Sequence, residues 1–441
     1  MDLKNPYAVF GKEIPCACGR THRVTPQEIV YANDAVARVP EMCARASQGR
    51  RAAVVMDVRT RDVAGQAVCD ALSRAGWTVQ SILVPDPAPK HSPVCDDVTR
   101  DWIAARMAPV ALAVSVGGGV MTDLTRWVTF ERKIPFVSVA TAASMNGYAS
   151  ASIAGMVKGV KCLIYAHAPF AVLADPRTIH DAPYLLTTSG LGDVLAKPIS
   201  TSDWRFNHMV LGDYYCPLSV GIVADIEPLY IDRPLDIRAR DPKAMEALFQ
   251  ACLLTGVAMN IADTSAPASG GEHMISHVLD MMCSVYGGEH DMHGRQVGIG
   301  TILSAAVYEK VLAVENPVFV EPARTTDHAF WGSLADEVEP YYQGKVERLR
   351  LMAERLATGG TWDHLRRTLR PMLRKPETLR NCLRQAEAAY RAEDIGCTPE
   401  RLKLALLHGH EIRPRITILD LARLVGVMPA AADDVIEEWG K

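Results

Sequence analysis

The first 185 residues alternate short apolar runs with stretches of helical periodicity. Five runs rich in β-branched residues predict buried strands, at residues 52–57, 78–84, 110–116, 134–139 and 170–175. A helix is predicted at residues 63–75, between the first two strands. Strands that alternate with helices are typical of a mostly parallel sheet with helices on its faces. The pattern therefore predicts an α/β domain over residues 1–184.

The pattern changes at about residue 185, where strand signals become rare. Long stretches at 242–261, 272–286 and 296–314 have the periodicity of helices, and the Leu-, Arg- and Ala-rich tail from 341 to 441 continues it. The tail ends in a predicted helix at 429–439. Residues 185–441 are therefore predicted to form a second, all-α domain.

Composition limits the classes of ligand. Lys plus Arg number 47 against 51 Asp plus Glu, for a net charge of −4, and the two signs are interspersed, so no basic surface for nucleic acid is expected. A small molecule is the expected ligand. No segment resembles an uninterrupted membrane span, and the start, Met1 to Pro6, lacks the apolar core of a secretory signal, which predicts a cytoplasmic protein.

Cysteine usage agrees with a reducing compartment. The 11 cysteines are scattered and odd in number, which favours reduced thiols over a disulfide framework. Cys16 and Cys18 are the one close pair. A metal clip there is the alternative, but the chain has no second pair to complete it.

Three histidines in the helical part indicate a catalytic metal site. His273, His277 and His293 lie within about twenty positions, and imidazole with carboxylate suits a divalent metal that keeps one position open for substrate. Asp193 is the candidate third ligand beside His273 and His293. His277 shares a helix face with His273, as a substrate contact, a proton relay or a structural histidine. Lys197, four residues after Asp193, is expected on the same helix face as Asp193, an arrangement otherwise typical of an exposed ion pair.

A glycine triplet after the third predicted strand is a candidate dinucleotide cradle. Gly117, Gly118 and Gly119 precede a predicted helix, and residues without side chains let backbone amides approach a diphosphate. The spacing is not G-x-G-x-x-G, so a simple turn is the alternative. Asp57 ends the first predicted strand, where it can bond an adenosine ribose and favour NAD(H) over NADP(H), or merely cap a helix.

The loop at residues 140–150 is rich in small and hydroxyl-bearing side chains. Thr141, Ser144 and Ser150 suit close approach to a nicotinamide and its ribose. The alternative is an ordinary Ser/Thr-rich loop, which the spacing alone does not reject.

Taken in order, these motifs resemble one enzyme family. They are Gly117-Gly118-Gly119-x-x-x-Asp123, Thr141-x-x-Ser144-x-x-Gly147-Tyr148-Ala149-Ser150, Gly192-Asp193-x-x-Ala196-Lys197, Ser269-Gly270-x-Glu272-His273-x-x-x-His277 and His293-Gly294-x-Gln296-Val297-Gly298. The order resembles the glycerol-1-phosphate dehydrogenases. The opening Cys16-Ala17-Cys18-Gly19-Arg20-x-His22 and the closing Ile416-x-Ile418-Leu419-Asp420-Leu421 are similar to their longer bacterial branch.

The resemblance implies a fold and a chemistry. The family belongs with the dehydroquinate synthases and iron-type alcohol dehydrogenases, so residues 1–184 would bind the dinucleotide and residues 185–441 the metal and substrate. The implied reaction is reversible reduction of dihydroxyacetone phosphate to sn-glycerol 1-phosphate with NAD(P)H and zinc or nickel. The implied metal ligands are Asp193, His273 and His293. Asp123 falls with the cofactor motif, and His277, Asn146 and Lys197 are the expected catalytic residues. The family also implies a homodimer.

Three positions depart from the family pattern. Asn146 stands where Asp is usual, Arg295 where Glu is usual, and Cys162 where Thr is usual. Loss of a carboxylate and reversal of a charge beside a metal ligand predict a changed substrate, such as another polyol phosphate, or weak activity. A dehydroquinate-synthase-like cyclase and a catalytically retired binding protein are the rival hypotheses.

Overall fold

The computed structural model describes residues 10–89, 91–222, 224 and 226–441, which form two compact units. The first unit contains Met1–Gly190, Gly221–Tyr230 and Ala239–Asp263, and the second contains Leu191–Val220, Ile231–Arg238 and Thr264–Lys441. The segment used to argue against a secretory signal, Met1 to Pro6, lies outside the described residues.

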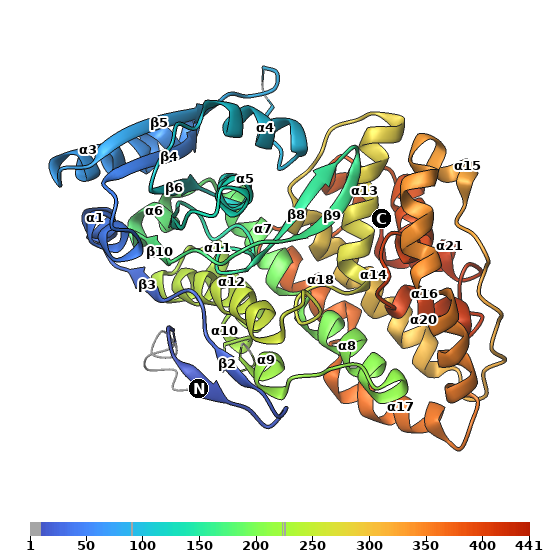
Figure 1. The fold of residues 1–441 in the computed structure, drawn as a ribbon. Coiled ribbons are helices and arrows are strands. Elements are labelled where there is room, and N and C mark those ends of the chain that lie inside the picture. The colour runs from blue at the N-terminus through green and yellow to red at the C-terminus, as the bar shows by residue number, and fades with distance from the viewer. Residues whose placement is uncertain (1–9, 90, 223, 225) are drawn as a thin grey trace. The chain divides into compact units, whose positions relative to one another are not determined.

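A six-stranded parallel sheet forms the centre of the first unit, with strand order β3-β10-β7-β6-β4-β5 (Figure 1). Its strands are β3 (Glu28–Tyr31), β4 (Arg51–Asp57), β5 (Thr78–Val84), β6 (Leu112–Gly117), β7 (Phe136–Ala140) and β10 (Ala171–Ala174). Two antiparallel hairpins accompany it, β1 (Glu13–Pro15) with β2 (Thr21–Arg23) and β8 (Ser152–Val157) with β9 (Val160–Tyr165).

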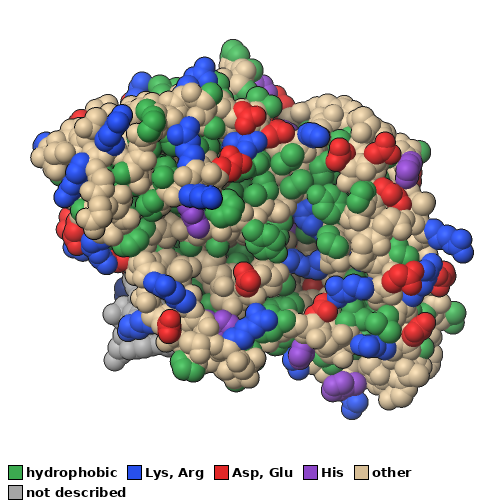
Figure 2. Space-filling view, in the orientation of Figure 1, with side chains coloured by type: hydrophobic (Ala, Val, Ile, Leu, Met, Phe, Trp, Pro, Cys, Tyr) green, Lys and Arg blue, Asp and Glu red, His purple; other side chains and the backbone are tan. Residues whose placement is uncertain are grey.

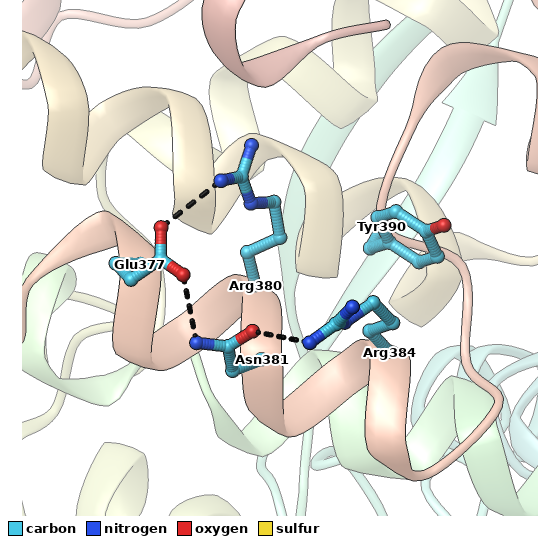
Figure 3. A pocket seen from close by; sticks show the side chains of 5 residues that line it. All are labelled: Glu377, Arg380, Asn381, Arg384 and Tyr390. Atoms are coloured by element: carbon cyan, nitrogen blue, oxygen red, sulfur yellow. Dashed lines mark hydrogen bonds and ion pairs between the residues drawn. The ribbon is translucent and has the colours of Figure 1, made fainter.

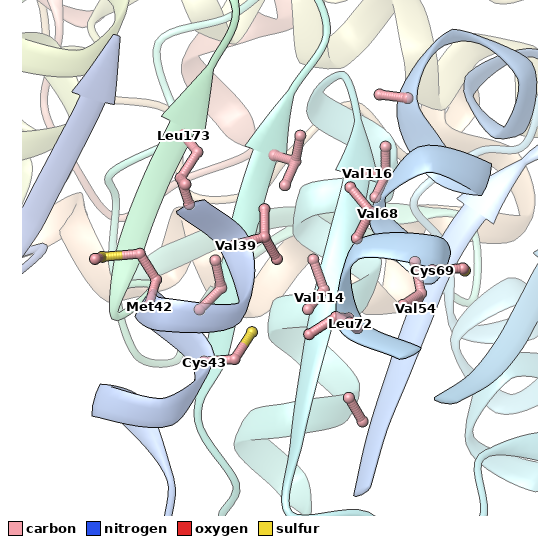
Figure 4. Packing of buried hydrophobic residues seen from close by; sticks show 14 of the residues in the cluster. Val39, Met42, Cys43, Val54, Val68, Cys69, Leu72, Val114, Val116 and Leu173 are labelled. Carbon is pink, nitrogen blue, oxygen red and sulfur yellow. The ribbon is translucent and has the colours of Figure 1, made fainter. Parts of the chain in front are cut away.

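Helices cover both faces of this sheet, which is why its central strands are apolar at most positions. In β4, Val54 packs in one core cluster and Val55 in the other, because successive side chains point to opposite faces. Helices α1 (Ala35–Ala46) and α3 (Gln66–Arg74) cover the first face, where Figure 4 shows Val39 and Leu72 against the strands. Helices α4 (Asp97–Arg106) and α5 (Gly119–Glu131) supply Ile103 and Leu124 to the other.

The predicted α/β class and all five predicted strands are confirmed, as β4, β5, β6, β7 and β10. The helix predicted at 63–75 is α3, preceded by α2 (Val58–Thr60) and a π-helical turn at Arg61–Gly65. Edge strand β3 and both hairpins were not predicted. Strands β1, β2 and β3 are short, and the apolar runs of β8 and β9 are interrupted by Gly155 and Lys161.

The chain from residue 184 onward is helical, as predicted. Its α-helices are α7 (Tyr184–Val194), α8 (Lys197–Leu211), α9 (Pro217–Gly221), α10 (Pro228–Ile231), α11 (Pro234–Arg238), α12 (Pro242–Ala262), α13 (Gly271–Tyr286), α14 (His293–Ala313), α15 (His328–Trp331), α16 (Ala335–Leu356), α17 (Thr361–Leu369), α18 (Pro376–Gln385), α19 (Pro399–His408), α20 (Ile418–Leu424) and α21 (Ala432–Trp439); α6 (Pro176–Asp181) precedes them. The predicted helices at 242–261, 272–286, 296–314 and 429–439 correspond to α12, α13, α14 and α21.

Helix α12 departs from the predicted division at 184/185, because it belongs to the first unit. Its Asn260 side chain donates to the carbonyl oxygen of Ala149 at 2.6 Å and accepts from the amide of Ala151 at 2.7 Å. Phe249 stacks on Tyr31 at 5.3 Å. By length and composition α12 could also cross a membrane, contrary to the expectation that no segment resembles a span, but 83% of its most apolar window is buried within the protein. These contacts make α12 a core helix.

Candidate metal centre and cofactor site

Three of the predicted site residues converge in the second unit. Asp193 near the end of α7, His273 in the first turn of α13 and His293 at the start of α14 each offer a ligand atom, and these atoms lie within 4.8 Å of one another. Nε2 of His273 lies 3.4 Å from Oδ1 of Asp193. Asp193 is 1% exposed and His273 5% exposed, so these two members are shielded from solvent, while His293 is partly exposed. Two imidazoles and one carboxylate form a donor set suited to zinc or a similar divalent metal.

The other ring nitrogen of His273 is held by Glu272. Nδ1 of His273 lies 2.8 Å from Oε1 of Glu272, which also accepts from the amide of Gly270 at 2.7 Å. An acceptor on Nδ1 fixes the proton there and leaves Nε2 to face Asp193. Burial opposes a charged ring, but hydrogen bonds to Asp193 and Glu272 raise the pKa of His273 to about 9 in the metal-free protein. The surroundings of His273 are therefore arranged to hold a positive charge.

His293 is anchored in the same way through Ser276. The Ser276 hydroxyl donates to Oε1 of Gln296 at 2.8 Å, and Nδ1 of His293 lies 2.9 Å from the same hydroxyl oxygen. Because the hydroxyl proton is committed to Gln296, the oxygen accepts from Nδ1–H of His293. Nε2 of His293 is thereby left as the ligand atom.

Close helix packing brings Asp193 to this group. A Cβ on Gly192 would lie 2.1 Å from the carbonyl oxygen of Gly294, and one on Gly298 would lie 3.2 Å from Cα of Gly192. Only residues without a side chain allow α7 and α14 to cross at this distance. A similar contact joins α13 and α14, where a Cβ on Gly300 would meet the carbonyl oxygen of Glu272 at 2.5 Å. Gly192, Gly298 and Gly300 therefore permit close contact between these helices.

A buried carboxyl fixes the start of α13. Asp203 of α8 accepts from the amide of Gly271 at 2.8 Å and from that of Ile418 at 3.0 Å, and also from the Tyr308 hydroxyl. Burial, with repulsion from Glu272, raises the pKa of Asp203 well above its usual value. The helix that carries His273 is thus tied to α8, α14 and α20.

His277 lies beside the group but is not one of its three members. It is one turn after His273 on α13, 4% exposed, and its ring stacks on that of His293 with centroids 5.5 Å apart. The predicted shared helix face of His273 and His277 is confirmed by their ring separation of 6.0 Å.

Lys197 does not share a helix face with Asp193, so that expectation is wrong. Helix α7 ends at Val194 and α8 begins at Lys197. Pro198 has no amide hydrogen to bond the carbonyl of residue 194, so one continuous helix is disfavoured there. Lys197 is 6% exposed and its ammonium lies 3.5 Å from the carbonyl oxygen of Ser219.

In the first unit, the predicted cofactor residues lie around the switch point of the sheet. From β4 the chain proceeds to β5 on one side and then to β6 on the other. In open α/β sheets, ligands bind at the carboxyl ends of the strands flanking such a point. Asp57 ends β4 and Gly117 ends β6, while Gly118 caps the following helix α5.

The carboxylate of Asp57 is engaged by its own chain. Oδ1 accepts from the amides of Arg59 and Thr60 at 2.9 and 2.8 Å, and Oδ2 pairs with the Arg59 guanidinium at 3.2 Å. Asp57 is therefore a helix cap, the alternative weighed from the sequence. The half-exposed Arg59 also bonds Asp86, so this cation is shared between two carboxylates.

Asp123 is likewise engaged. It forms a buried pair with Arg126, whose guanidinium also donates to the carbonyl oxygens of Gly147 at 2.7 Å and Tyr148 at 3.1 Å. Burial raises the pKa of Asp123 and lowers that of Arg126. The pair holds the loop after β7 in place, a positioning role that the sequence did not predict.

This loop packs directly against the glycine triplet. The amide of Thr141 donates to the carbonyl oxygen of Gly117 at 3.2 Å, and a Cβ on Gly118 would lie 3.3 Å from Oγ of Ser144. Gly119 similarly faces the Met145 side chain. Within the loop, the Tyr148 hydroxyl donates to the carbonyl of Ala142 at 2.7 Å and accepts from Ser144 at 2.9 Å. The three glycines therefore permit close contact with the loop after β7.

The two main departures have different surroundings. Arg295 pairs with Asp291 at 3.0 Å and bonds the carbonyl of Asp394, so its charge is matched locally. Asn146 lies in the loop after β7 and is 9% exposed; Ser150, in the same loop, is 1% exposed and its hydroxyl bonds Ser152. Cys162 lies in β9 opposite Gly155.

Positive and negative side chains are interspersed on the face shown in Figure 2. A cavity of about 260 Å³ in the second unit is lined by Glu377, Arg380, Asn381, Arg384 and Tyr390. Figure 3 shows that its charged groups bond one another along α18, for example Arg380 with Glu377 at 3.0 Å. None of the predicted site residues lines it.

Comparison with known proteins defines the class. Residues 30–183 match the family described as iron-containing alcohol dehydrogenase. The fold is that of a probable glycerol dehydrogenase from Sinorhizobium meliloti 1021 (TM-score 0.61, 17% identity, covering 93% of this chain and 95% of that one). A maleylacetate reductase from Agrobacterium tumefaciens gives a TM-score of 0.61 at 16% identity, covering 97% and 98%. Fold and sequence together define an oxidoreductase of the iron-containing alcohol dehydrogenase class.

Curated relatives narrow this class. The glycerol-1-phosphate dehydrogenase [NAD(P)+] of Pyrococcus furiosus is 31% identical over 283 residues, 64% of this chain and 79% of that protein. The enzyme of the same name from Bacillus licheniformis is 26% identical over 421 residues, 94% and 93% of the two chains. The chain belongs to the glycerol-1-phosphate dehydrogenase family.

Proposed function

We propose that this protein is a metal-dependent dehydrogenase that reduces dihydroxyacetone phosphate, or a related polyol-phosphate ketone, with NAD(H) in preference to NADP(H). The observation that carries the proposal is the convergence of Asp193, His273 and His293, each histidine with its Nδ1 already held by an acceptor. Family membership supports the substrate class, because the relatives are named for glycerol 1-phosphate.

Asp193, His273 and His293 would hold zinc or nickel, which when bound polarises a ketone oxygen and stabilises the developing alkoxide. Glu272 and Ser276 orient the two imidazoles through their Nδ1 atoms. Burial of Asp193 and His273 excludes water from this side of the group. His277, stacked on His293, is the candidate to hold or move a proton.

The cofactor proposal rests on backbone placement. The carboxyl ends of β4 and β6, the N-terminus of α5 and the loop with Thr141, Ser144 and Ser150 meet at the switch point, where a dinucleotide binds in open α/β folds. Gly117, Gly118 and Gly119 would approach the diphosphate. Asp57 favours NAD(H), although Arg59 beside it offsets part of its charge. Lys197, as a buried cation, is the candidate contact for a substrate phosphate in the second unit.

A single assay tests the reaction. Purified protein loaded with zinc or nickel should consume NADH when dihydroxyacetone phosphate is added, and the product should be sn-glycerol 1-phosphate by chiral analysis. A dehydroquinate-synthase-like cyclase regenerates its bound NAD, so turnover without net NADH consumption would favour that rival. If the protein bound neither metal nor dinucleotide, only the hypothesis of a catalytically retired binding protein would remain.

Asn146 provides the sharper test of substrate. Restoring the family's carboxylate with Asn146→Asp should raise kcat/KM for dihydroxyacetone phosphate by about tenfold, the effect of one recovered hydrogen bond to a polar substrate. Asn33→Asp, at an exposed asparagine of the first unit, is the control for a general effect of charge. No gain in a folded Asn146→Asp protein would mean that Asn146 does not determine the substrate.

A further inference from the structure

The hairpin of β1 and β2, drawn in dark blue in Figure 1, carries three side chains of types that ligate metals, none of which belongs to the catalytic group. The sulfur atoms of Cys16 and Cys18 and a ring nitrogen of His22 lie within 4.8 Å of one another. Sγ of Cys18 is 3.1 Å from Nε2 of His22. None of the 11 cysteines forms a disulfide.

The turn between the strands explains how two cysteines only two positions apart can meet. In an extended strand, residues at i and i+2 point the same way but about 7 Å apart. Here the amide of Gly19 donates to the carbonyl of Cys16 at 3.0 Å, and the amide of Cys16 donates to Arg20 at 3.0 Å. Gly19 has φ +82°, a conformation that favours glycine. The tight turn folds the two thiols towards one point.

His22 occupies a position where the strand pattern calls for an apolar residue. In β2 the side chains alternate exposed, buried and exposed, and the buried one is His22, 6% exposed. On β1 the opposite residue, Ile14, is only partly buried. Within β1 and β2 themselves no apolar side chain is fully buried, and a short two-stranded hairpin gains from an additional constraint. Three convergent soft and borderline ligands can supply one.

We propose that Cys16, Cys18 and His22 bind a structural zinc ion, separate from the catalytic metal. Zinc lies about 2.3 Å from thiolate sulfur and about 2.1 Å from imidazole nitrogen, so ligand atoms in a tetrahedral site are roughly 3.5–3.8 Å apart. Movements of under about 1 Å convert the observed separations into that geometry. The two thiolates balance the charge of the ion, and a fourth ligand from the rest of the chain or a water completes the shell. The zinc closes the hairpin in place of a hydrophobic core.

Metal content distinguishes this site from the catalytic one. The full-length protein purified from zinc-supplemented medium should contain about two metal ions per chain by mass spectrometry. The Cys16→Ser/Cys18→Ser double variant and the His273→Ala variant should each contain about one, and Cys397→Ser, at another partly buried cysteine, about two. Unchanged metal content in the Cys16/Cys18 variant would overturn the proposal.

Cobalt substitution gives a readout that depends on thiolate alone. The cobalt-loaded protein should show a near-ultraviolet thiolate-to-cobalt charge-transfer band, since the catalytic group has no sulfur ligand. The band should persist in His273→Ala and disappear in Cys16→Ser/Cys18→Ser. A wild-type protein without the band contradicts the proposal.

Wild-type protein alone gives a third test, should the double variant fail to fold. Zinc should slow alkylation of Cys16 and Cys18 at least about tenfold, and chelation should abolish this protection while leaving Cys397 unchanged. Any additional cysteine protected in parallel identifies the fourth ligand. Equal reactivity of Cys16 and Cys18 with and without zinc would mean that the cluster is only a thiol–imidazole contact.

Discussion

The candidate side chains of the first unit are bonded to their own fold, whereas those of the second unit converge on one point. Around the sheet, Asp57 caps a helix, Asp123 pairs with Arg126 and Ser144 bonds Tyr148, so the polar side chains serve their own fold. In the helical unit, His273 and His293 direct ligand atoms at one point and use their other nitrogens for anchoring. A dinucleotide is held largely by backbone amides and helix ends, whereas a metal is held by side chains. Residue type therefore predicts the second kind of site better than the first.

Removal of a metal ligand should give the largest effect. His293→Ala should remove the catalytic metal and lower kcat/KM by at least about a thousand-fold, because a Lewis-acid metal supplies several kcal/mol to the transition state. Metal content and steady-state kinetics measure this, with the exposed His180→Ala as the control. Full activity in metal-free His293→Ala would contradict a metal site in the second unit, and with it the difference between the two units.

The anchoring of His273 should matter less, though still strongly. Glu272→Gln keeps an acceptor for Nδ1 of His273 but removes the charge, which should weaken metal affinity by about 10- to 100-fold. Competition with a chelator measures the affinity. Glu309→Gln, at an exposed glutamate of α14, should leave it unchanged. Equal affinities in the two variants would show that Glu272 does not tune the site.

The helix crossing that brings Asp193 to the group can be tested through Gly192. Gly192→Ala places a Cβ 2.1 Å from the Gly294 carbonyl oxygen, so the free energy of unfolding should fall by about 1–3 kcal/mol from overpacking. Metal affinity should fall with it, since the helices must separate. Gly221→Ala, where the added Cβ meets no atom within 4 Å, is the matched control for denaturant unfolding. Equal stabilities would contradict the close crossing.

The smallest effect is expected at Asp57, where a cap and a cofactor contact can be separated. Asp57→Asn retains the capping oxygen, so stability should change by less than about 0.5 kcal/mol, while loss of the charge should shift preference towards NADP(H) several-fold. The ratio of kcat/KM for the two cofactors measures the shift. An unchanged ratio would mean that Asp57 only caps a helix. The first unit would then have one fewer candidate side chain that contacts a ligand.

The sequence predicted the class of fold and the central elements because these depend on long periodic signals. Strands β4 to β7 and helices α12 to α14 have enough regular positions to be recognised. Edge strand β3 has four residues and the β1–β2 hairpin has three per strand, too few for periodicity to distinguish. The break between α7 and α8 was missed although Pro198 signals it.

The sequence pointed to the three residues that converge in the second unit but not to the residues that support them. Asp193, His273 and His293 were found because few other roles need such residue types together. Ser276 is an unremarkable helix residue in sequence, and its role depends on Gln296 committing the hydroxyl proton. His22 could have been noticed as a polar residue at the buried position of a strand, but only once that strand was known.

The division of the chain between the two units has a consequence for how the protein can be altered. The backbone passes from one unit to the other at 190/191, 220/221, 230/231, 238/239 and 263/264. No single cut in the gene yields either unit whole, and a fragment ending at residue 184 would lack α12 and the Asn260 amide that bonds Ala149 and Ala151. Recombination could therefore not exchange the nucleotide half between relatives as a cassette.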